Sequence, residues 1–515
     1  MAVIALAAVF FMSVNVSAAQ THWFETAGTS SNENGSVIAS SSGYLYVGGT
    51  TDLEDTSGLN AFLSKMSTDG TVSFFRIIGE QGSRENVTGI AADDSGYIYL
   101  VGYTNAFTPS DASSSVNAIF VAKFDSAGSL VWAEYIGATS AGDDDYGLGI
   151  TYASDGYLYI SGSYQGSLFV AKIDPNKAPS SDSNNVKWFN VYEFKAASSE
   201  PIGMAYSSYS NSLYLAFTTS NIYGSDDVAV LKIDTSNNGA PVWITTFGGE
   251  ENDYATGLTL TGEPNGPRGE KDVVVIGSTN SFHILGTASY TDYNVFVAYL
   301  YSDDGNLHDP VVIGRDGEDD YSGNIVFSLD DVSLYFTGTT YSYGEVSEGY
   351  PDGFVAGLPV GQSVSWFKTV GGEKTEYMRG IVIGPDNYLY TAGYTMSFGE
   401  GGSDMAALLA SDNLGNMTWT ENDFPENVMV HDASPGSASF SPGTSTSTKL
   451  NYNTASVTPI PWSPTTDIDY SNNKNFNTHL ATDDNTPDPV PEPWLVSMVT
   501  LGFLAVGVFL FSRRH

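Results

Sequence analysis

Cysteine is absent from the 515 residues of this chain, and basic residues are scarce. Without cysteine there are no disulfides, thiolate metal sites or cysteine nucleophiles, although export is still compatible with the sequence. Only 19 Lys and Arg oppose 59 Asp and Glu, which gives a formal net charge of −40 at pH 7. Such a surface repels phosphate and attracts cations, so no nucleic acid is expected as a partner.

Histidine is also rare, with six in the chain, and no His-x-x-x-His pair, Gly-x-Ser-x-Gly elbow or phosphate loop occurs. These motifs would indicate a zinc peptidase, a serine hydrolase or a nucleotide-binding enzyme. No catalytic residue and no cofactor is therefore assigned from the sequence.

The first residues read as a signal peptide over 1–19. An apolar stretch from Ala2 to Val14 is too short for a stable membrane span, and small residues follow it, with cleavage expected after Ala18 or Ala19. The usual Lys or Arg ahead of the apolar run is missing. A buried core helix is the alternative interpretation, and export is the expectation.

The dominant feature is an internal repeat whose best-marked unit is "GYIYLVGYT" at 96–104. Its copies align at Tyr46, Tyr99, Tyr159, Tyr214, Val274, Tyr335 and Tyr390. The mean spacing of about 57 residues is close to one four-stranded propeller blade with its loops. Apolar alternation, aromatic residues and Gly, Asp and Asn turns indicate strands throughout.

One type of strand occurs once more than the others. A strand marked by Trp or its replacement appears eight times, at Trp23, Phe74, Trp132, Trp188, Trp243, Asp309, Trp366 and Trp419. The other three strand types appear seven times. A ring needs such an extra strand, because an N-terminal strand can pair into the last blade, replacing the strand around Trp419 or lying beside it. The expected fold class is all-β: a single seven-bladed β-propeller over 20–425 with N-terminal strand closure.

The repeat resembles a known family. The stretch "GIAADDSGYIYLVGYT … IFVAKFDSAGSLVWAEYIG" at 89–137 is similar to the bacterial SBBP β-propeller repeat. The resemblance implies the propeller fold and no particular activity, because a fold does not set a function.

Two further segments follow the repeats. Residues 426–489 are rich in Ser, Thr, Asn and Pro, a composition that cannot build a core, so a disordered stalk is expected there. Residues 490–515 resemble a PEP-CTERM sorting signal. Its elements are Pro491, Glu492 and Pro493, an apolar transmembrane helix over 494–511, and a basic end at Arg513 and Arg514.

This second resemblance implies a partner and a location. In that family an exosortase-type membrane peptidase processes the tail, and the protein reaches the cell surface or the extracellular matrix. The membrane is then a transient partner, contacted through the C-terminal helix. The alternative is a permanent single-span anchor, oriented by the basic residues at its end.

An acidic residue precedes the first strand of six of the seven repeats. The set is Glu33, Glu85, Asp145, Asp253, Asp320 and Glu376. The favoured interpretation is that each carboxylate accepts N–H bonds from turns between blades. The alternative is an acidic rim that binds Ca²⁺, a cation or a sugar, for which the weak calcium candidates are Asp143, Asp145, Asp316 and Asp320.

The near-uniform repeats and the missing motifs favour a non-catalytic surface or matrix protein. Its propeller would serve adhesion or the binding of an extracellular glycan or protein ligand. The alternative is a secreted propeller enzyme, a hydrolase or a quinoprotein-like oxidoreductase, whose site is assembled from several blades on one face.

Overall fold

The computed structural model describes most of the chain between Trp23 and Thr482. The described residues are 23–28, 31–52, 58–80, 82–107, 116–137, 144–179, 185–196, 201–263, 269–284, 292–343, 349–398, 404–411, 429–432, 436–439, 443–447, 450–454, 460–462, 466–469 and 477–482. They form β-strands and one short 3₁₀ helix, η1 (Thr235–Asn237).

Burial along the strands explains why the sequence folds into radial sheets. The first strand of a blade alternates between buried and half-exposed residues, as in β6, whereas the second and third strands are buried on both sides, as in β8. A strand covered on both faces requires a continuous apolar run. The runs "IYLVG" and "AIFVA" of the repeat meet that requirement because neighbouring blades cover both faces.

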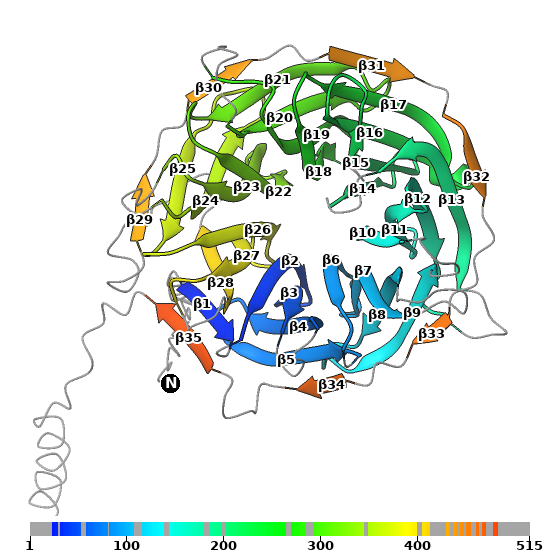
Figure 1. The fold of residues 1–515 in the computed structure, drawn as a ribbon, viewed down its shortest axis with the longest axis vertical. Helices are drawn as coiled ribbons and strands as arrows, with labels where there is room; N and C mark the ends of the chain where they lie inside the picture. Colours follow the sequence, from blue (N-terminus) through cyan, green and yellow to red (C-terminus); the bar gives the residue numbers. More distant parts are fainter. Residues whose placement is uncertain are drawn as a thin grey trace, which may run out of the picture.

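The described strands form seven five-stranded antiparallel sheets, arranged as blades around a common axis (Figure 1). In six blades, four consecutive strands run outward from the axis. The first three of these blades contain β2 (Glu33–Ser41), β3 (Tyr44–Thr51), β4 (Asn60–Ser67) and β5 (Val72–Gly79); β6 (Glu85–Ala92), β7 (Ile98–Phe107), β8 (Val116–Phe124) and β9 (Leu130–Gly137); and β10 (Tyr146–Tyr152), β11 (Leu158–Tyr164), β12 (Ser167–Ile173) and β13 (Val186–Lys195).

The next three blades repeat the arrangement. They contain β14 (Gly203–Ser207), β15 (Ser212–Ser220), β16 (Asp226–Asp234) and β17 (Ala240–Gly248); β18 (Asp253–Glu263), β19 (Gly269–Thr279), β20 (Asn294–Tyr301) and β21 (Leu307–Gly314); and β22 (Asp320–Ser328), β23 (Ser333–Thr340), β24 (Asp352–Pro359) and β25 (Trp366–Gly371).

The last blade joins the two ends of the repeat region. Strands β26 (Glu376–Ile383), β27 (Leu389–Thr395) and β28 (Asp404–Ser411) are followed in the sheet by β1 (Trp23–Gly28). Strand β1 pairs antiparallel with β28, with Ala27 opposite Met405, and both side chains are fully buried. The ring is thus closed by backbone hydrogen bonds between segments almost 400 residues apart.

The core lies between adjacent blades. One buried cluster contains Tyr99 and Val121 of the second blade together with Leu158 and Phe169 of the third. The repeat tyrosine is part of this packing, because Tyr99 is fully buried and its hydroxyl donates to Asp93 Oδ2 at 2.9 Å. These side chains fix the contact between blades.

The turn residues of the repeat have a local role. Asp93 Oδ1 accepts the N–H groups of Ser95 and Tyr97, both at 2.9 Å, and Gly96 has a φ of +84°, which favours glycine. The Asp-x-x-Gly pattern therefore specifies the tight connection between the first and second strands.

A fifth strand covers the outer edge of every blade, and all seven come from the C-terminal segment (Figure 1). They are β29 (Met429–Asp432), β30 (Gly436–Ser439), β31 (Gly443–Ser447), β32 (Tyr452–Thr454), β33 (Ile460–Trp462), β34 (Thr466–Asp469) and β35 (Asn477–Thr482). In that order they pair with β25, β21, β17, β13, β9, β5 and β1. We call β29–β35 the belt, because it passes round the whole ring in the reverse order of the blades.

The expected fold class is therefore corrected. The predicted disordered stalk over 426–489 is wrong, because this segment supplies all seven belt strands, and each blade has five strands rather than four. Within the described residues no helix is long and apolar enough to cross a membrane. The signal peptide over 1–19 and the helix expected over 494–511 both lie outside the described residues.

Candidate functional site

One end of the ring carries most of the polar groups singled out from the sequence. In antiparallel blades the first and third strands begin, and the second and fourth end, at the same edge. Asp253 at the start of β18 is thus opposite Thr279 at the end of β19, which is opposite Asn294 at the start of β20. We call this edge the acidic end.

The six predicted carboxylates lie at the acidic end, one per blade junction, and are buried. Five are the first residues of β2, β6, β18, β22 and β26, and Asp145 directly precedes β10. None of them is more than 2% exposed: Glu33, Glu85, Asp145, Asp253, Asp320 and Glu376. They therefore do not line an open rim.

Glu376 illustrates the contacts of these carboxylates. Its Oε1 accepts the Thr395 hydroxyl at 2.8 Å and the Ser397 N–H at 3.2 Å, and its Oε2 accepts the Gly372 N–H at 2.9 Å. Thr395 ends β27 of the same blade, whereas Gly372 follows β25 of the preceding blade. The carboxylate thus bonds two neighbouring blades to each other.

The other carboxylates also accept hydrogen bonds, and those to Asp253 again come from two neighbouring blades. Asp253 Oδ2 accepts the Gly249 N–H at 2.8 Å and the Ser281 hydroxyl at 2.9 Å. Asp320 Oδ2 accepts the Ser342 hydroxyl at 2.8 Å, and Glu85 Oε1 accepts the Thr104 hydroxyl at 2.8 Å. Glu33 accepts the Thr51 hydroxyl at 3.0 Å, and Asp145 accepts the Gln165 N–H at 2.9 Å.

Burial changes the acidity of these groups. Loss of solvent raises the pKa of Glu85 to about 7 and the pKa values of Asp253 and Asp320 to about 6. The hydrogen bonds favour the charged form and oppose this increase, but burial has the larger effect. The pKa of Glu376 is raised for the same reason. Glu85, Asp253 and Asp320 therefore change charge closer to neutral pH than exposed carboxyl groups do.

A glycine at the end of the fourth strand makes room for the carboxylates. A Cβ on Gly371 would lie 2.0 Å from Asp352 Oδ1 and 2.8 Å from Glu376 Oε2. This close approach explains the Gly that completes the "WFKTVG" type of strand in the repeat.

A second group at the acidic end is formed by tyrosines. Six half-buried side chains lie across the fifth, sixth and seventh blades. We call them the tyrosine row: Tyr254, Tyr293, Tyr321, Tyr341, Tyr377 and Tyr394. Three of them directly follow the buried carboxylates on the innermost strands β18, β22 and β26, which lie closest to the ring axis (Figure 1).

Ring contacts connect the members of this row. The ring centroids of Tyr254 and Tyr293 are 5.9 Å apart, and those of Tyr293 and Tyr321 are 5.2 Å apart. Tyr341 and Tyr377 are hydrogen-bond partners, and burial together with this bond raises the pKa of Tyr341 to about 12. The row therefore combines hydroxyl groups with partly exposed aromatic rings.

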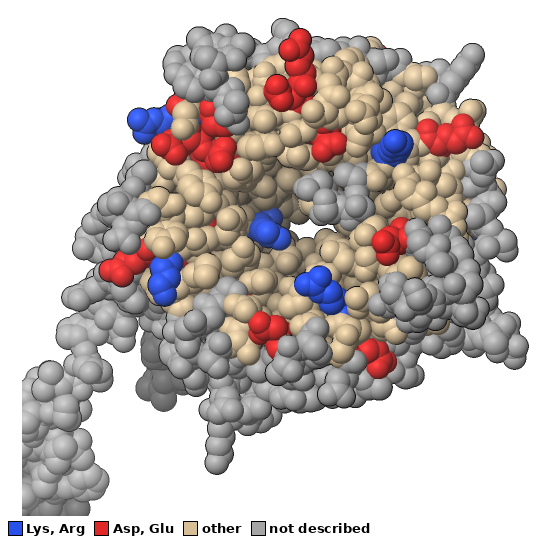
Figure 2. Space-filling view, in the orientation of Figure 1, with Lys and Arg blue, Asp and Glu red and all other residues tan. Residues whose placement is uncertain are grey.

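The row continues to Tyr394 and an exposed cation. The ring centroids of Tyr377 and Tyr394 are 5.0 Å apart. The guanidinium carbon of the exposed Arg379 lies 6.0 Å from the Tyr377 centroid and 5.8 Å from that of Tyr394. Figure 2 shows, on the face turned to the viewer, basic side chains beside a central opening, with acidic groups distributed further out.

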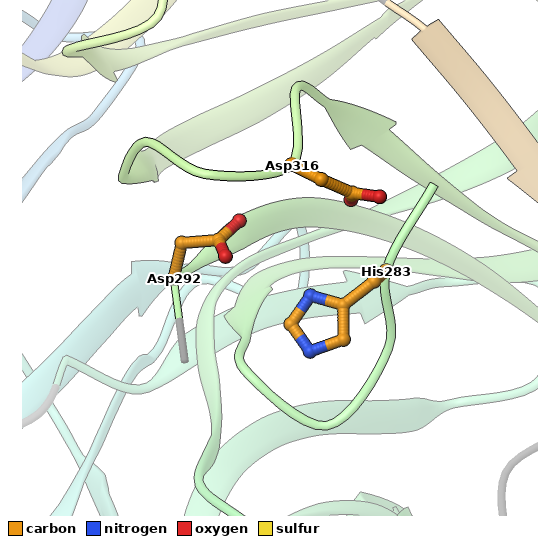
Figure 3. Close-up of side chains that lie close together, drawn as sticks. All are labelled: His283, Asp292 and Asp316. Carbon is orange, nitrogen blue, oxygen red and sulfur yellow. The ribbon is translucent and has the colours of Figure 1, made fainter. Parts of the chain in front are cut away.

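Of the four calcium candidates predicted from the sequence, the three that the structure describes do not lie together at one site. Asp143 lies outside the described residues, and Asp145 and Asp320 are the buried carboxylates of two blade junctions. Asp316 is partly exposed and lies with His283 and Asp292, two residues that the sequence did not single out as ligands (Figure 3). The sorting motif, Pro491 to Pro493 with Arg513 and Arg514, lies outside the described residues.

Comparisons with known proteins concern the fold. The family model of the SBBP β-propeller repeat matches residues 74–107. No curated protein matches the chain.

Several solved structures are similar at low identity. A protein of unknown function from Bacteroides caccae has 9% identity and a TM-score of 0.35 over 67% of this chain and 93% of its own. Trypanosoma rangeli sialidase has 10% identity and a TM-score of 0.37; the match covers 74% of this chain and 55% of the sialidase chain. Thermotoga petrophila endo-1,5-alpha-L-arabinanase has 11% identity and a TM-score of 0.22; the match covers 73% of this chain and 98% of the arabinanase chain. Likeness at this level says nothing about activity.

Proposed function

We propose that this chain is an exported, non-catalytic surface protein whose propeller binds an extracellular glycan at the acidic end. The single observation that carries the proposal is the tyrosine row. Partly exposed aromatic rings with hydroxyl groups offer an apolar surface and hydrogen bonds together, which suits a ligand with both C–H faces and hydroxyls. Arg379 adds a donor for an acidic sugar or a carboxylate.

The belt supports the choice of the acidic end. It occupies the outer edge of each blade, so the outermost strand of each sheet is a belt strand of only three to six residues, and such short edge strands are poor templates for pairing with another chain. The two ends of the ring are the surfaces left for recognition. Of these, the acidic end combines the tyrosine row with the exposed Arg379.

The location belongs to the same proposal. A signal peptide over 1–19 and a PEP-CTERM-like tail over 490–515 would export the chain and present it to an exosortase-type peptidase, which delivers it to the cell surface or matrix. A permanent C-terminal anchor would give the same exposure of the propeller.

A secreted propeller enzyme is the second candidate. Carboxyl groups with pKa values near neutrality, such as that of Glu85, are suited to general acid catalysis. The candidate is weaker because Glu85 is fully buried and accepts bonds from Ser83 and Thr104, so a substrate has no direct route to it.

The proposal is tested with the purified full-length protein on an array of bacterial and plant glycans. Binding to one structural class of glycan, without cleavage of the sugar, supports it. Release of sugar products from the array would instead support the enzyme, and retention of no glycan at all would contradict the proposed function.

A further inference from the structure

Three potential metal ligands converge beside the tyrosine row. His283, Asp292 and Asp316 each place one ligand atom within 4.8 Å of those of the other two (Figure 3). They come from two segments: His283 and Asp292 lie between β19 and β20, and Asp316 lies in the turn between β21 and β22. We call these three residues the fifth-blade triad.

Local bonds hold the two segments together. Asp316 Oδ1 accepts the Ile284 N–H at 2.7 Å, which joins the turn to the residue after His283. Asp292 is 8% exposed, and its Oδ2 accepts Asn294 Nδ2 at 3.4 Å. His283 and Asp316 are partly exposed, so solvent and ions reach the triad from outside.

The triad is not part of the repeat. The register places Thr279, Thr340 and Thr395 at equivalent positions, and four residues further on the chain has His283, Gly344 and Gly399. The sixth blade has Tyr350 where the fifth has Asp292. Among the described residues no other blade brings three such ligands together, so the repeat does not require this combination.

The donor set indicates the kind of ion. One imidazole nitrogen with two carboxylate oxygens suits Zn²⁺ and related first-row divalent ions, whereas Ca²⁺ prefers six to eight oxygen ligands. Bringing two carboxylates together costs free energy, and a divalent cation between them relieves their repulsion.

We propose that the fifth-blade triad binds one divalent transition-metal ion through His283, Asp292 and Asp316, with water completing the coordination. The ion links the β19–β20 connection to the turn that leads into the sixth blade. It lies next to Tyr293, which directly follows Asp292, and so adds a positive charge at the edge of the tyrosine row.

The test measures Zn²⁺ binding to full-length protein freed of metal by a chelator, with a chromophoric competitor as the readout. One equivalent of Zn²⁺ is expected to bind, and millimolar Ca²⁺ should not displace it. His283→Ala should abolish this equivalent, and Asp316→Asn should weaken it by at least ~10-fold, the loss that even outer-shell changes produce. The melting temperature without metal checks that each variant is folded.

Two variants serve as matched controls. Glu373→Gln changes the exposed residue at the same turn position of the sixth blade, and His308→Ala removes a histidine that contacts Asp272 and Asp309. Both should keep the equivalent of Zn²⁺. Binding that survives His283→Ala, binding lost in His308→Ala, displacement by Ca²⁺, or the lack of a stoichiometric equivalent would each overturn the proposal.

Discussion

Asn451 and Glu193 exchange two hydrogen bonds although 258 residues separate them in the chain. Asn451 Nδ2 donates to Glu193 Oε2 at 2.8 Å, and the Glu193 N–H donates to the Asn451 carbonyl at 3.0 Å. Beside them, Tyr452 stacks on Tyr192 with ring centroids 5.6 Å apart, and Leu450 packs against the same core cluster. These contacts attach the belt to the third blade through side chains as well as backbone.

The first prediction concerns the stability that the belt contributes. Deleting 429–515 should lower the melting temperature by several degrees and cause self-association, because the outer strands of the blades become exposed edges. Deletion of 490–515 alone is the control and should leave both properties unchanged. Calorimetry and light scattering measure the two effects, and equal melting of both truncations would contradict a structural role for the belt.

A point substitution tests the same contact more locally. Tyr452→Ala should cost about 1–2 kcal/mol, because it removes the stacking on Tyr192 and opens a partial cavity. Asn451→Ala, which removes a bond at an exposed position, should cost about 0.5 kcal/mol. Denaturant unfolding of both variants gives the comparison, and an equal cost would argue against packing as the main contribution of this segment.

Ring closure gives the second prediction. Deletion of 20–30 removes β1, which pairs with β28 on one side and β35 on the other. The free energy of unfolding should fall by several kcal/mol, since two strands lose their partner and Met405 loses its contact with Ala27. A truncated chain that stays monomeric and melts at the wild-type temperature would contradict closure through β1.

How much of this fold the sequence predicted depends on how each strand is stabilised. The strands of the blades were recognisable because burial on both faces demands apolar runs, and the turn between them demands Asp and Gly, as at Asp93 and Gly96. The eighth Trp-type strand indicated β1 as the closing strand, and β1 pairs with β28.

The belt could not be recognised in the same way. Its strands span three to six residues and are rich in Ser, Thr, Asn and Gly, which is also the composition of disordered segments. An outer edge strand pairs through its backbone, so it needs no apolar alternation.

The candidate sites show a similar limit. The sequence located the carboxylates at the start of the first strands, but their full burial depends on Thr and Ser side chains from the neighbouring strand, such as Thr395 for Glu376. The spacing of His283, Asp292 and Asp316 along the chain matches no known metal-ligand motif. These three residues come together only through the strand register.

The buried carboxylates predict an unusual dependence of stability on pH. The folded-state pKa values of Asp253 and Asp320, about 6, and of Glu85, about 7, lie above their ordinary values of 3.8 and 4.5. An acid whose pKa is raised by folding stabilises the fold fully below its unfolded pKa, and that contribution is lost as the pH rises through the folded pKa. Through these groups, the melting temperature should fall between about pH 4 and pH 7.

Two variants test the cause of this dependence. Asp253→Asn and Asp320→Asn should flatten the profile between pH 4 and 7, because the amide does not titrate. At pH 5 each should cost about 1 kcal/mol through the weakened bonds to its partners. The exposed Glu373→Gln is the control and should leave the slope unchanged. A wild-type melting temperature that rises with pH over this range would show that the buried carboxylates are ionised without penalty.

Export makes a prediction for the native host. If an exosortase-type peptidase processes the tail near Pro491 to Pro493, intact-mass measurement of cell-surface material should find chains without residues 494–515. Replacing Glu492 with Ala should leave the full-length chain in the membrane fraction. Full-length wild-type chains in the membrane would instead support the permanent anchor.

Isothermal titration calorimetry tests most directly the proposal that the tyrosine row binds a glycan. The affinity of the glycan retained on the array is measured for the wild-type protein and for variants. Tyr321→Ala and Arg379→Ala should each weaken binding by about 10-fold or more, the effect of losing one ring or charged contact. Tyr209→Ala is the matched control, because this tyrosine is 63% exposed in the turn between β14 and β15, at the opposite end of the ring. The account predicts unchanged affinity for Tyr209→Ala. Unchanged affinity for Tyr321→Ala and Arg379→Ala, or a loss in Tyr209→Ala alone, would contradict it.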